Sequence, residues 1–320
     1  MQNKKIVILG TGGTIAGRSN TAADNIGYTP GQVSIEQLVQ GIPGLSTLDN
    51  LVIEQIAQID SKDISFCTWA YLAKRVLHYL VQENVQGVVI THGTDTLEET
   101  AYFLHAVLGQ IKPTVLTCAM RPATALCPDG PQNLIDAVTV AMQVNAQGVV
   151  AVCAGVVHSA ENIQKVHTYR LDPYSSGDAG PIGYVEQNAL RLVKNWPAVH
   201  GFSTFNAIKN IALLNGGNAW PQVEIVMSYA GANGAVVDGL LAMGVQGLVV
   251  AGTGNGTVHH ELEAALLKAQ AAGVSIVRAT RCVNGHVISK TEDAFESSQG
   301  LSPVKARIAL MLGLLTLHIA

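Results

Sequence analysis

The sequence predicts an α/β protein with a larger N-terminal domain on a mostly parallel sheet and a smaller C-terminal α/β domain. A chain of 320 residues is too long for one ordinary core. Hydrophobic residues make up 48% of it and charged residues only 13%, as expected where sheets are covered on both faces. Short β-branched runs alternate with helical patterns, which favours parallel strands joined by right-handed crossovers.

The N-terminal two-thirds of the chain contains apolar runs that are short enough for buried strands. The predicted strands are 5–9, 52–58, 87–91, 114–118 and 148–153. The predicted helices between them are 34–40, 68–83, 95–108 and 133–145. The third helix has a marked start, because Asp95 can cap it and Glu98 follows three residues later, as in a capping box.

The alternation stops at about 157–208, where the sequence is irregular and rich in turn residues. We therefore expect an N-terminal domain at 1–190, a linker at 191–212 and a C-terminal domain at 213–320. The predicted strands of the second domain are 222–229, 246–251 and 274–279, and its predicted helices are 233–243, 258–272 and 304–318.

Composition and cysteine usage narrow the class of protein. The net charge of −4 does not indicate the basic surface typical of a nucleic-acid-binding protein. No apolar run approaches the roughly 20 residues of a membrane span. The five cysteines show no Cys-x-x-Cys spacing, so we expect no metal or cofactor, and Cys118 and Cys153 are predicted as buried free thiols. Met1 leads directly into a strand without an apolar signal segment, which predicts a reduced, cytoplasmic protein.

Two glycine-rich loops that carry threonines follow apolar strands. The first contains Thr11-Gly-Gly-Thr14-Ile-Ala-Gly17, and the second contains Thr91-His-Gly-Thr94-Asp95-Thr96. In open α/β sheets, ligands bind beyond the carboxyl ends of the strands. Loops from neighbouring strands would bring Thr14, Thr94 and Asp95 into one pocket, which predicts hydroxyl chemistry on a small substrate.

The first loop also admits other interpretations. Gly12-x-x-x-x-Gly17-Arg18-Ser19 differs from a phosphate-binding P-loop by an arginine in place of lysine, and no acidic partner for Mg²⁺ ends a later strand. The loop lacks the third glycine of a dinucleotide site. It can also be a plain tight turn. Small neighbours around Thr14 would nevertheless let a ligand reach both its hydroxyl and backbone N–H groups that stabilise an oxyanion.

Three further groups have both a structural and a functional interpretation. Asp95 can cap a helix, hold a substrate ammonium, or do both. Lys165 can be a solvated surface charge, or it can be partly buried and help to activate a hydroxyl. Gly252-Thr-Gly-Asn255-Gly256 is either a turn or a pocket rim at a subunit contact. His259-His260-Glu261 lacks the i, i+4 histidines of a zinc protease.

The two threonine loops resemble the signature segments of the bacterial-type L-asparaginases. The similarity runs nearly end to end and is weak only around 283–300. Its other matching segments are Tyr28-Thr-Pro-Gly, Ala119-Met-Arg-Pro, Asp129-Gly-Pro-Gln-Asn133, the Lys165 segment, Gly180-Pro-Ile-Gly-Tyr184, Gly254-Asn-Gly and Pro303-Val-Lys-Ala-Arg307.

The resemblance implies hydrolysis of L-asparagine to L-aspartate and ammonia through an acyl-enzyme, with L-glutamine as a slower substrate and a homotetramer built from dimers. Thr14 would be the nucleophile on a mobile loop, assisted by Tyr28, and Thr94 with Lys165 would form a second hydroxyl–amine pair. The implied substrate-binding residues are Ser61, Lys62, Asp95, Asn255 and Glu292, with Ser61 at the α-carboxylate, Asp95 at the α-ammonium, and Asn255 and Glu292 from a neighbouring subunit.

Some details of this site depart from the family's pattern. Lys62 stands where family members of this type usually have Gln or Glu, so it would either meet the substrate's head group or point to solvent. Glu292 is placed by counting from Arg281. A tyrosine with a pKa near 10 is a mediocre base, so Tyr28 needs a perturbed environment or help from Lys165. The rival functions are a P-loop-type nucleotide hydrolase and a non-catalytic amino-acid-binding protein.

Overall fold

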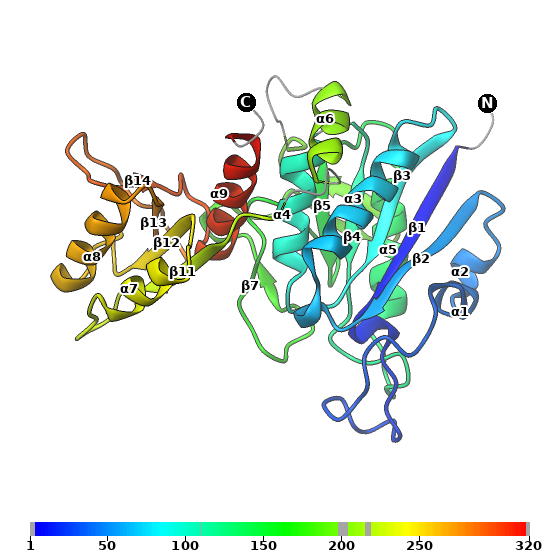
Figure 1. The fold of residues 1–320 in the computed structure, drawn as a ribbon. Helices are drawn as coiled ribbons and strands as arrows, with labels where there is room; N and C mark the ends of the chain where they lie inside the picture. The colour runs from blue at the N-terminus through cyan, green and yellow to red at the C-terminus, as the bar shows by residue number, and fades with distance from the viewer. Residues whose placement is uncertain (1–3, 110, 198–203, 215–218, 318–320) are drawn as a thin grey trace. The chain divides into compact units, whose positions relative to one another are not determined.

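The structure of the protein is a computed structural model. It describes residues 4–109, 111–197, 204–214 and 219–317. The chain divides into two compact units, Met1–Asn215 and Gly216–Ala320. Each unit is an α/β layer structure on its own sheet (Figure 1). The predicted fold class is therefore confirmed.

An eight-stranded sheet forms the centre of the first unit, in the order β10-β9-β6-β5-β4-β3-β1-β2. Its strands are β1 (Lys5–Gly12), β2 (Leu51–Ile59), β3 (Val85–Thr91), β4 (Thr114–Thr117), β5 (Val149–Cys153), β6 (Val156–Ser159), β9 (Gly183–Glu186) and β10 (Ala189–Leu192). The five strands from β2 to β5 pair in parallel, and β6, β9 and β10 continue the sheet antiparallel. Buried apolar side chains dominate the central strands, as expected for a sheet covered on both faces.

Helices cover both faces of this sheet (Figure 1). They are α1 (Ile35–Gln40), α2 (Pro43–Ser46), α3 (Phe66–Leu80), α4 (Leu97–Leu108), α5 (Gly130–Ala141) and α6 (Thr204–Leu214). Side chains of α1, α2 and α5 form one core with Ile6, Ile8 and Val89. Helices α3 and α4 pack together, and the rings of Trp69 and Phe103 stack with centroids 4.8 Å apart. The short strands β7 (Gln164–Lys165) and β8 (Tyr174–Ser175) form a separate antiparallel pair.

Two local predictions in the first unit are wrong. Helix α4 begins at Leu97, and Thr96 is its N-cap residue without a side-chain cap bond. Asp95 does not cap the helix, because its carboxylate instead binds the Lys165 ammonium. The segment 157–208, predicted to be irregular, contains β9, β10 and the start of α6. The turn between β9 and β10 uses Gln187 and Asn188 at φ 50° and 58°, so it lacks the glycine that usually marks such a hairpin.

The second unit has a four-stranded sheet in the order β11-β12-β13-β14, and all its pairs are parallel. Its elements are β11 (Val223–Met227), α7 (Ala235–Ala242), β12 (Gly247–Gly252), α8 (His260–Ala271), β13 (Ser275–Thr280), β14 (Glu296–Ser297) and α9 (Pro303–Leu317). Side chains of α7 and α8 pack on one face of the sheet, and Ala306 of α9 packs against Val249 and Ala279 on the other. None of the helices within the described ranges has the length and apolar character that a membrane crossing requires.

The order of strands fixes where the first unit can bind a ligand. Strand β1 lies between β2 and β3, so the direction of winding reverses there. In open α/β sheets the crevice at such a reversal, beyond the carboxyl ends of the strands, is the usual ligand site. Gly10 of β1 pairs with Thr91 of β3, so both threonine loops leave the sheet side by side at this edge.

Candidate active site

The two threonine loops touch each other through glycines. Gly13 has φ 79°, and a Cβ placed on it would lie 2.3 Å from the Cα of Gly93. A Cβ on Gly93 would lie 2.5 Å from the hydroxyl of Ser61. Any larger residue at either position would push backbone against backbone or against Ser61. The glycines of both loops are therefore required by the close approach as well as by the positive φ of Gly13.

Thr14 begins the 3₁₀ turn η1 (Thr14–Ala16) and makes a hydrogen bond of 2.6 Å with the Tyr28 hydroxyl. The chain between them returns on itself because Arg18 and Thr29 exchange two backbone hydrogen bonds of 2.9 Å. Gly17 leaves room for the Tyr28 ring, since a Cβ there would lie 2.8 Å from ring carbon Cδ2. The structure thus brings together the pair that the resemblance implied.

The surroundings of Tyr28 favour its neutral form. Burial raises the pKa of Tyr28 above its usual value, the Thr14 hydrogen bond lowers it by a smaller amount than burial raises it, and the carboxylates of Asp60 and Asp95 add lesser increases. The phenol therefore keeps its proton at neutral pH. Only a lowered pKa would leave Tyr28 ionised at neutral pH, and this environment raises the pKa instead. Tyr28 can therefore accept a proton from Thr14 only by passing its own proton onward.

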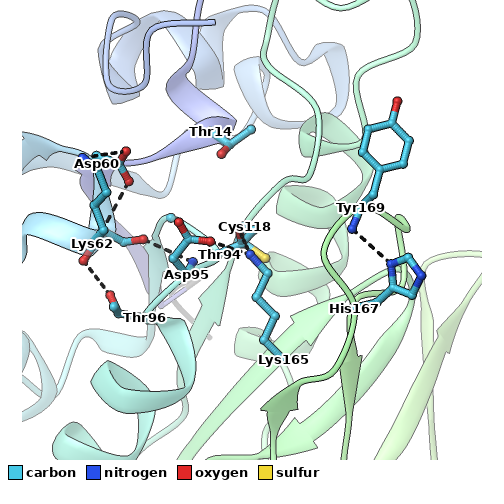
Figure 2. Close-up of polar contacts among 12 residues, drawn as sticks. Thr14, Asp60, Lys62, Thr94, Asp95, Thr96, Cys118, Lys165, His167 and Tyr169 are labelled. Carbon is cyan, nitrogen blue, oxygen red and sulfur yellow. Dashed lines mark hydrogen bonds and ion pairs between the residues drawn. The ribbon is translucent and has the colours of Figure 1, made fainter. Parts of the chain in front are cut away.

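Lys165 connects the two functional side chains of the second loop. Its ammonium donates to the Thr94 hydroxyl at 2.8 Å and to the Asp95 carboxylate at 2.5 Å. Figure 2 shows Thr14 with its hydroxyl turned toward these residues. The Lys165 side chain is only 18% exposed, and its backbone N–H donates to Glu98. Of the two interpretations of this lysine, the partly buried one describes its position.

Ser61 lies directly against the second loop. It is buried in the 3₁₀ turn η2 (Ser61–Asp63), its hydroxyl accepts from the backbone N–H of Asp95 at 3.3 Å, and its carbonyl accepts from the Thr96 hydroxyl at 2.7 Å. The side chain of Asp60 caps this turn by accepting from the N–H of Lys62. The predicted carboxylate-binding residue is therefore adjacent to the predicted ammonium-binding one.

The Lys62 ammonium binds carboxylates of its own turn. Its side chain is 60% exposed, and its ammonium binds the carboxylates of Asp60 and Asp63 at 3.2 and 2.6 Å. These two carboxylates raise the pKa of Lys62 above its usual value. The ammonium is thus paired with its neighbours in the turn, and its exposed side chain corresponds to the second of the two positions predicted for Lys62, in which it points to solvent.

Asn255 and Glu292 both lie in the second unit. The side-chain amide of Asn255 exchanges two hydrogen bonds with the backbone of Ile288, at 3.1 and 2.7 Å. Glu292 is exposed in a turn. Their contribution to a site in a neighbouring subunit remains a prediction. His259 has a structural role, since it caps α8 by accepting from the N–H of Glu261.

A buried chain of hydrogen bonds, which no motif in the sequence predicted, packs behind the second loop and holds it. The Trp69 indole donates to the Thr100 hydroxyl at 2.8 Å, Thr100 lies 2.9 Å from His92 Nε2, and His92 Nδ1 lies 2.8 Å from the carbonyl of Gly93. A carbonyl can only accept, so Nδ1 carries the proton and Nε2 accepts from Thr100. Complete burial lowers the pKa of His92 to about 4. The apolar run at 87–90 that directly precedes Thr91 is the sequence signal for a buried, neutral histidine at position 92.

The chain matches known proteins over both units. Residues 5–198 match the family described as "Asparaginase, N-terminal", and residues 222–317 match "Glutaminase/Asparaginase C-terminal domain". The chain belongs to the asparaginase family. This membership confirms the family that the two threonine loops predicted.

Individual relatives agree with the family match. The chain is 36% identical to "L-asparaginase 2" of Bacillus subtilis, with 97% of this chain and 82% of the relative covered. It is 36% identical to the "Glutaminase-asparaginase" of Pseudomonas fluorescens, with 97% and 86% covered. A solved structure described as a probable cytoplasmic L-asparaginase from Campylobacter jejuni superposes with a TM-score of 0.89 at 37% identity, covering 97% of this chain and 95% of that one.

The neutral His92 predicts an acid-dependent loss of stability. Its pKa is about 4 in the folded state and near 6.5 when unfolded, so the unfolded chain binds an extra proton between these values. The free energy of unfolding should fall by about 3 kcal/mol as the pH drops from above 6.5 through 4, and this contribution should level off about one pH unit below the folded-state pKa. Chemical denaturation of wild type and His92→Gln across this range measures it. An equally steep decline in His92→Gln would show that other groups cause the effect.

Proposed function

We propose that this protein hydrolyses the side-chain amide of L-asparagine to L-aspartate and ammonia through an acyl-enzyme on Thr14, with L-glutamine as a slower substrate. The observation that supports this most directly is the presence of two hydroxyl groups at the strand reversal, each paired with a proton-transfer partner. Thr14 is paired with Tyr28, and Thr94 with Lys165. Threonine is a weak nucleophile and an amide a poor electrophile, so both need such assistance.

The reaction has two halves. Thr14 Oγ1 bonds to the amide carbon while its proton passes to Tyr28, and backbone N–H groups of the glycine loop stabilise the oxyanion. The carbon–nitrogen bond then breaks, and the nitrogen takes up a proton and leaves as ammonia. Water next attacks the resulting ester carbon, gives its proton back through the same groups, and releases the carboxylate and the Thr14 hydroxyl.

The proton route follows from the state of Tyr28. Because its pKa is raised, Tyr28 acts as a relay that accepts the Thr14 proton while it releases its own toward the leaving nitrogen. Thr94 and Lys165 form the second route. The Thr94 hydroxyl orients the attacking water and relays its proton, and the Lys165 ammonium, which donates to that hydroxyl, stabilises the negative charge that develops on the acyl oxygen.

The substrate's charged head group would lie at the second loop. The Asp95 carboxylate, which is half exposed, binds the α-ammonium, and Ser61 binds the α-carboxylate. Lys62 has no contact with substrate in this scheme because Asp60 and Asp63 already bind it. Asn255 and Glu292 would close the site from a neighbouring subunit, as the family resemblance implies.

We further propose a homotetramer built from dimers. The support is the family resemblance, which assigns Asn255 and Glu292 to the site of another copy. Sedimentation of the purified protein tests the assembly, and an active monomer would contradict it.

We also propose that the protein is cytoplasmic. The Campylobacter jejuni structure is described as a probable cytoplasmic enzyme, whereas a relative from Haemophilus influenzae, 37% identical, is described as periplasmic. Fractionation of the source cells, followed by an asparaginase assay of each fraction, distinguishes the two locations.

Removal of the Thr14 hydroxyl tests the acyl-enzyme. Thr14→Val keeps the shape of the side chain, so the protein should fold normally and lose about 10⁴-fold or more in kcat. Thr21→Val in the same loop is the matched control, because the Thr21 side chain is exposed, and this variant should keep wild-type activity. Ammonia release from asparagine, without nucleotide or metal, is the assay. It also separates the amidase from a nucleotide hydrolase and from a protein that binds without turnover. Wild-type kcat in Thr14→Val would rule out this nucleophile.

Replacement of Lys165 tests the second route. Lys165→Met should lose roughly 10²–10⁴-fold in kcat and far less in apparent binding, as expected for a proton-transfer group. Lys268→Met is the matched control, since Lys268 also pairs with an aspartate, Asp238 at 3.1 Å, but is 71% exposed in the second unit. Steady-state kinetics of both variants decide the matter. A Lys165→Met enzyme within a few-fold of wild type would remove this lysine from the mechanism.

A further inference from the structure

The buried Tyr174 makes a hydrogen bond to the backbone at the centre of the site. Its hydroxyl donates to the carbonyl oxygen of Thr94 at 2.7 Å. Across the parts of the chain that the structure describes, no other group donates to that carbonyl. Tyr174 is 8% exposed, and burial raises its pKa well above the usual value. The phenol is therefore a donor over the whole pH range in which the enzyme would work.

The bond fixes one peptide group at both ends. The carbonyl of Thr94 and the N–H of Asp95 belong to the same planar unit and point in opposite directions. Tyr174 holds the carbonyl end, and the Ser61 hydroxyl accepts from the N–H end at 3.3 Å. With both ends held, this peptide plane has one orientation. That orientation sets the directions in which the Thr94 and Asp95 side chains leave the backbone.

Tyr174 is also tied to Lys165 through the main chain. Strand β8 pairs with β7 in a register that places Tyr174 opposite Lys165. The Lys165 ammonium returns to the side chains of Thr94 and Asp95. The contacts therefore form a closed ring: from Tyr174 to the Thr94 carbonyl, from the Thr94 hydroxyl to the Lys165 ammonium, and from the Lys165 backbone back to Tyr174.

The thiol next to Tyr174 is consistent with this direction of donation. The Cys118 sulfur lies 3.9 Å from the phenol oxygen, to which its thiol donates weakly. Because the Thr94 carbonyl can only accept, the phenol's own proton is directed to Thr94, and the phenol oxygen can accept the weak hydrogen bond from the thiol.

We propose that Tyr174 is a positioning residue that aligns the Thr94–Asp95 peptide group, so that both side chains meet the Lys165 ammonium in the geometry required for turnover. The inference rests on the proposed amidase function. It concerns the alignment of the second hydroxyl–amine pair and gives Tyr174 no contact with substrate.

The test removes the hydroxyl alone. Tyr174→Phe should fold and lower kcat for asparagine on the order of 10-fold to 10²-fold, as expected for a misplaced catalytic group. The change in KM should be smaller, because the half-exposed Asp95 side chain can still reach the substrate. The matched control is Tyr102→Phe, which removes a hydroxyl from another buried tyrosine, on α4, and should leave kcat unchanged. Equal losses of kcat in the two variants, or an unchanged kcat in Tyr174→Phe, would overturn the proposal.

A double-mutant cycle separates alignment from mere structural support. If Tyr174 acts through Lys165, then Tyr174→Phe added to Lys165→Met should cost no more than about twofold further in kcat. An activated β-hydroxamate of L-aspartate as substrate keeps the slow variants measurable. Independent, multiplicative losses would contradict the proposed route, and so would failure of Tyr174→Phe to fold while Tyr102→Phe folds. Absence of asparagine hydrolysis by wild type would instead refute the proposed function, so the two failures are distinguishable.

Discussion

The contact between the backbones at Gly13 and Gly93 is the constraint on which the rest of the site depends. Parallel strands β1 and β3 deliver their loops to the same edge of the sheet, but adjacent strands alone leave ordinary side chains between the loops. With glycine on both sides, the backbones meet, and a Cβ at either place would lie within 2.5 Å of a neighbouring atom. Thr14 then follows Gly13 directly, and Thr94 follows Gly93. The hydroxyls of Thr14 and Thr94, which are far apart in the sequence, are therefore both placed next to the Gly13–Gly93 contact.

The two threonines beside this contact have hydrogen-bond partners of different charge. On the first loop, Thr14 faces a neutral phenol whose pKa is raised by burial and by two carboxylates. On the second loop, Thr94 faces an ammonium that is also bound to a carboxylate. One hydroxyl therefore has a partner suited to relaying a proton, and the other has a partner suited to stabilising negative charge. An amidase needs both kinds of assistance, because the nucleophile must lose a proton while negative charge develops on the carbonyl oxygen.

The sequence predicted the architecture well because its main signals are local. Apolar runs and glycine loops identified β1, β3 and the two threonines. Because loops at the carboxyl ends of parallel strands lie at one edge of the sheet, the sequence also predicted that Thr14, Thr94 and Asp95 meet there. What it missed depends on long-range partners. Tyr174 sits in an irregular stretch with no periodic pattern, and its role follows only from a bond across 80 residues to Thr94. Asp95 was predicted to cap α4, but an ion pair with Lys165, which the local sequence does not show, competes for its carboxylate.

The two backbone hydrogen bonds between Arg18 and Thr29 determine what would happen if the loop that carries Tyr28 were cleaved. They close the base of the loop that carries Tyr28, while its tip is open to solvent, with Ile26 78% exposed. Below that base, Gly31 bonds to Gly13, and Gln32 and Val33 bond to Ala16. Strand β1 is meanwhile held between two neighbours. A protease that cut the tip would therefore sever the polypeptide without separating its pieces. Thr14 would remain on the short fragment and Tyr28 on the long one, still hydrogen-bonded, and the nicked protein would run as two bands on a denaturing gel but elute as one species in native buffer.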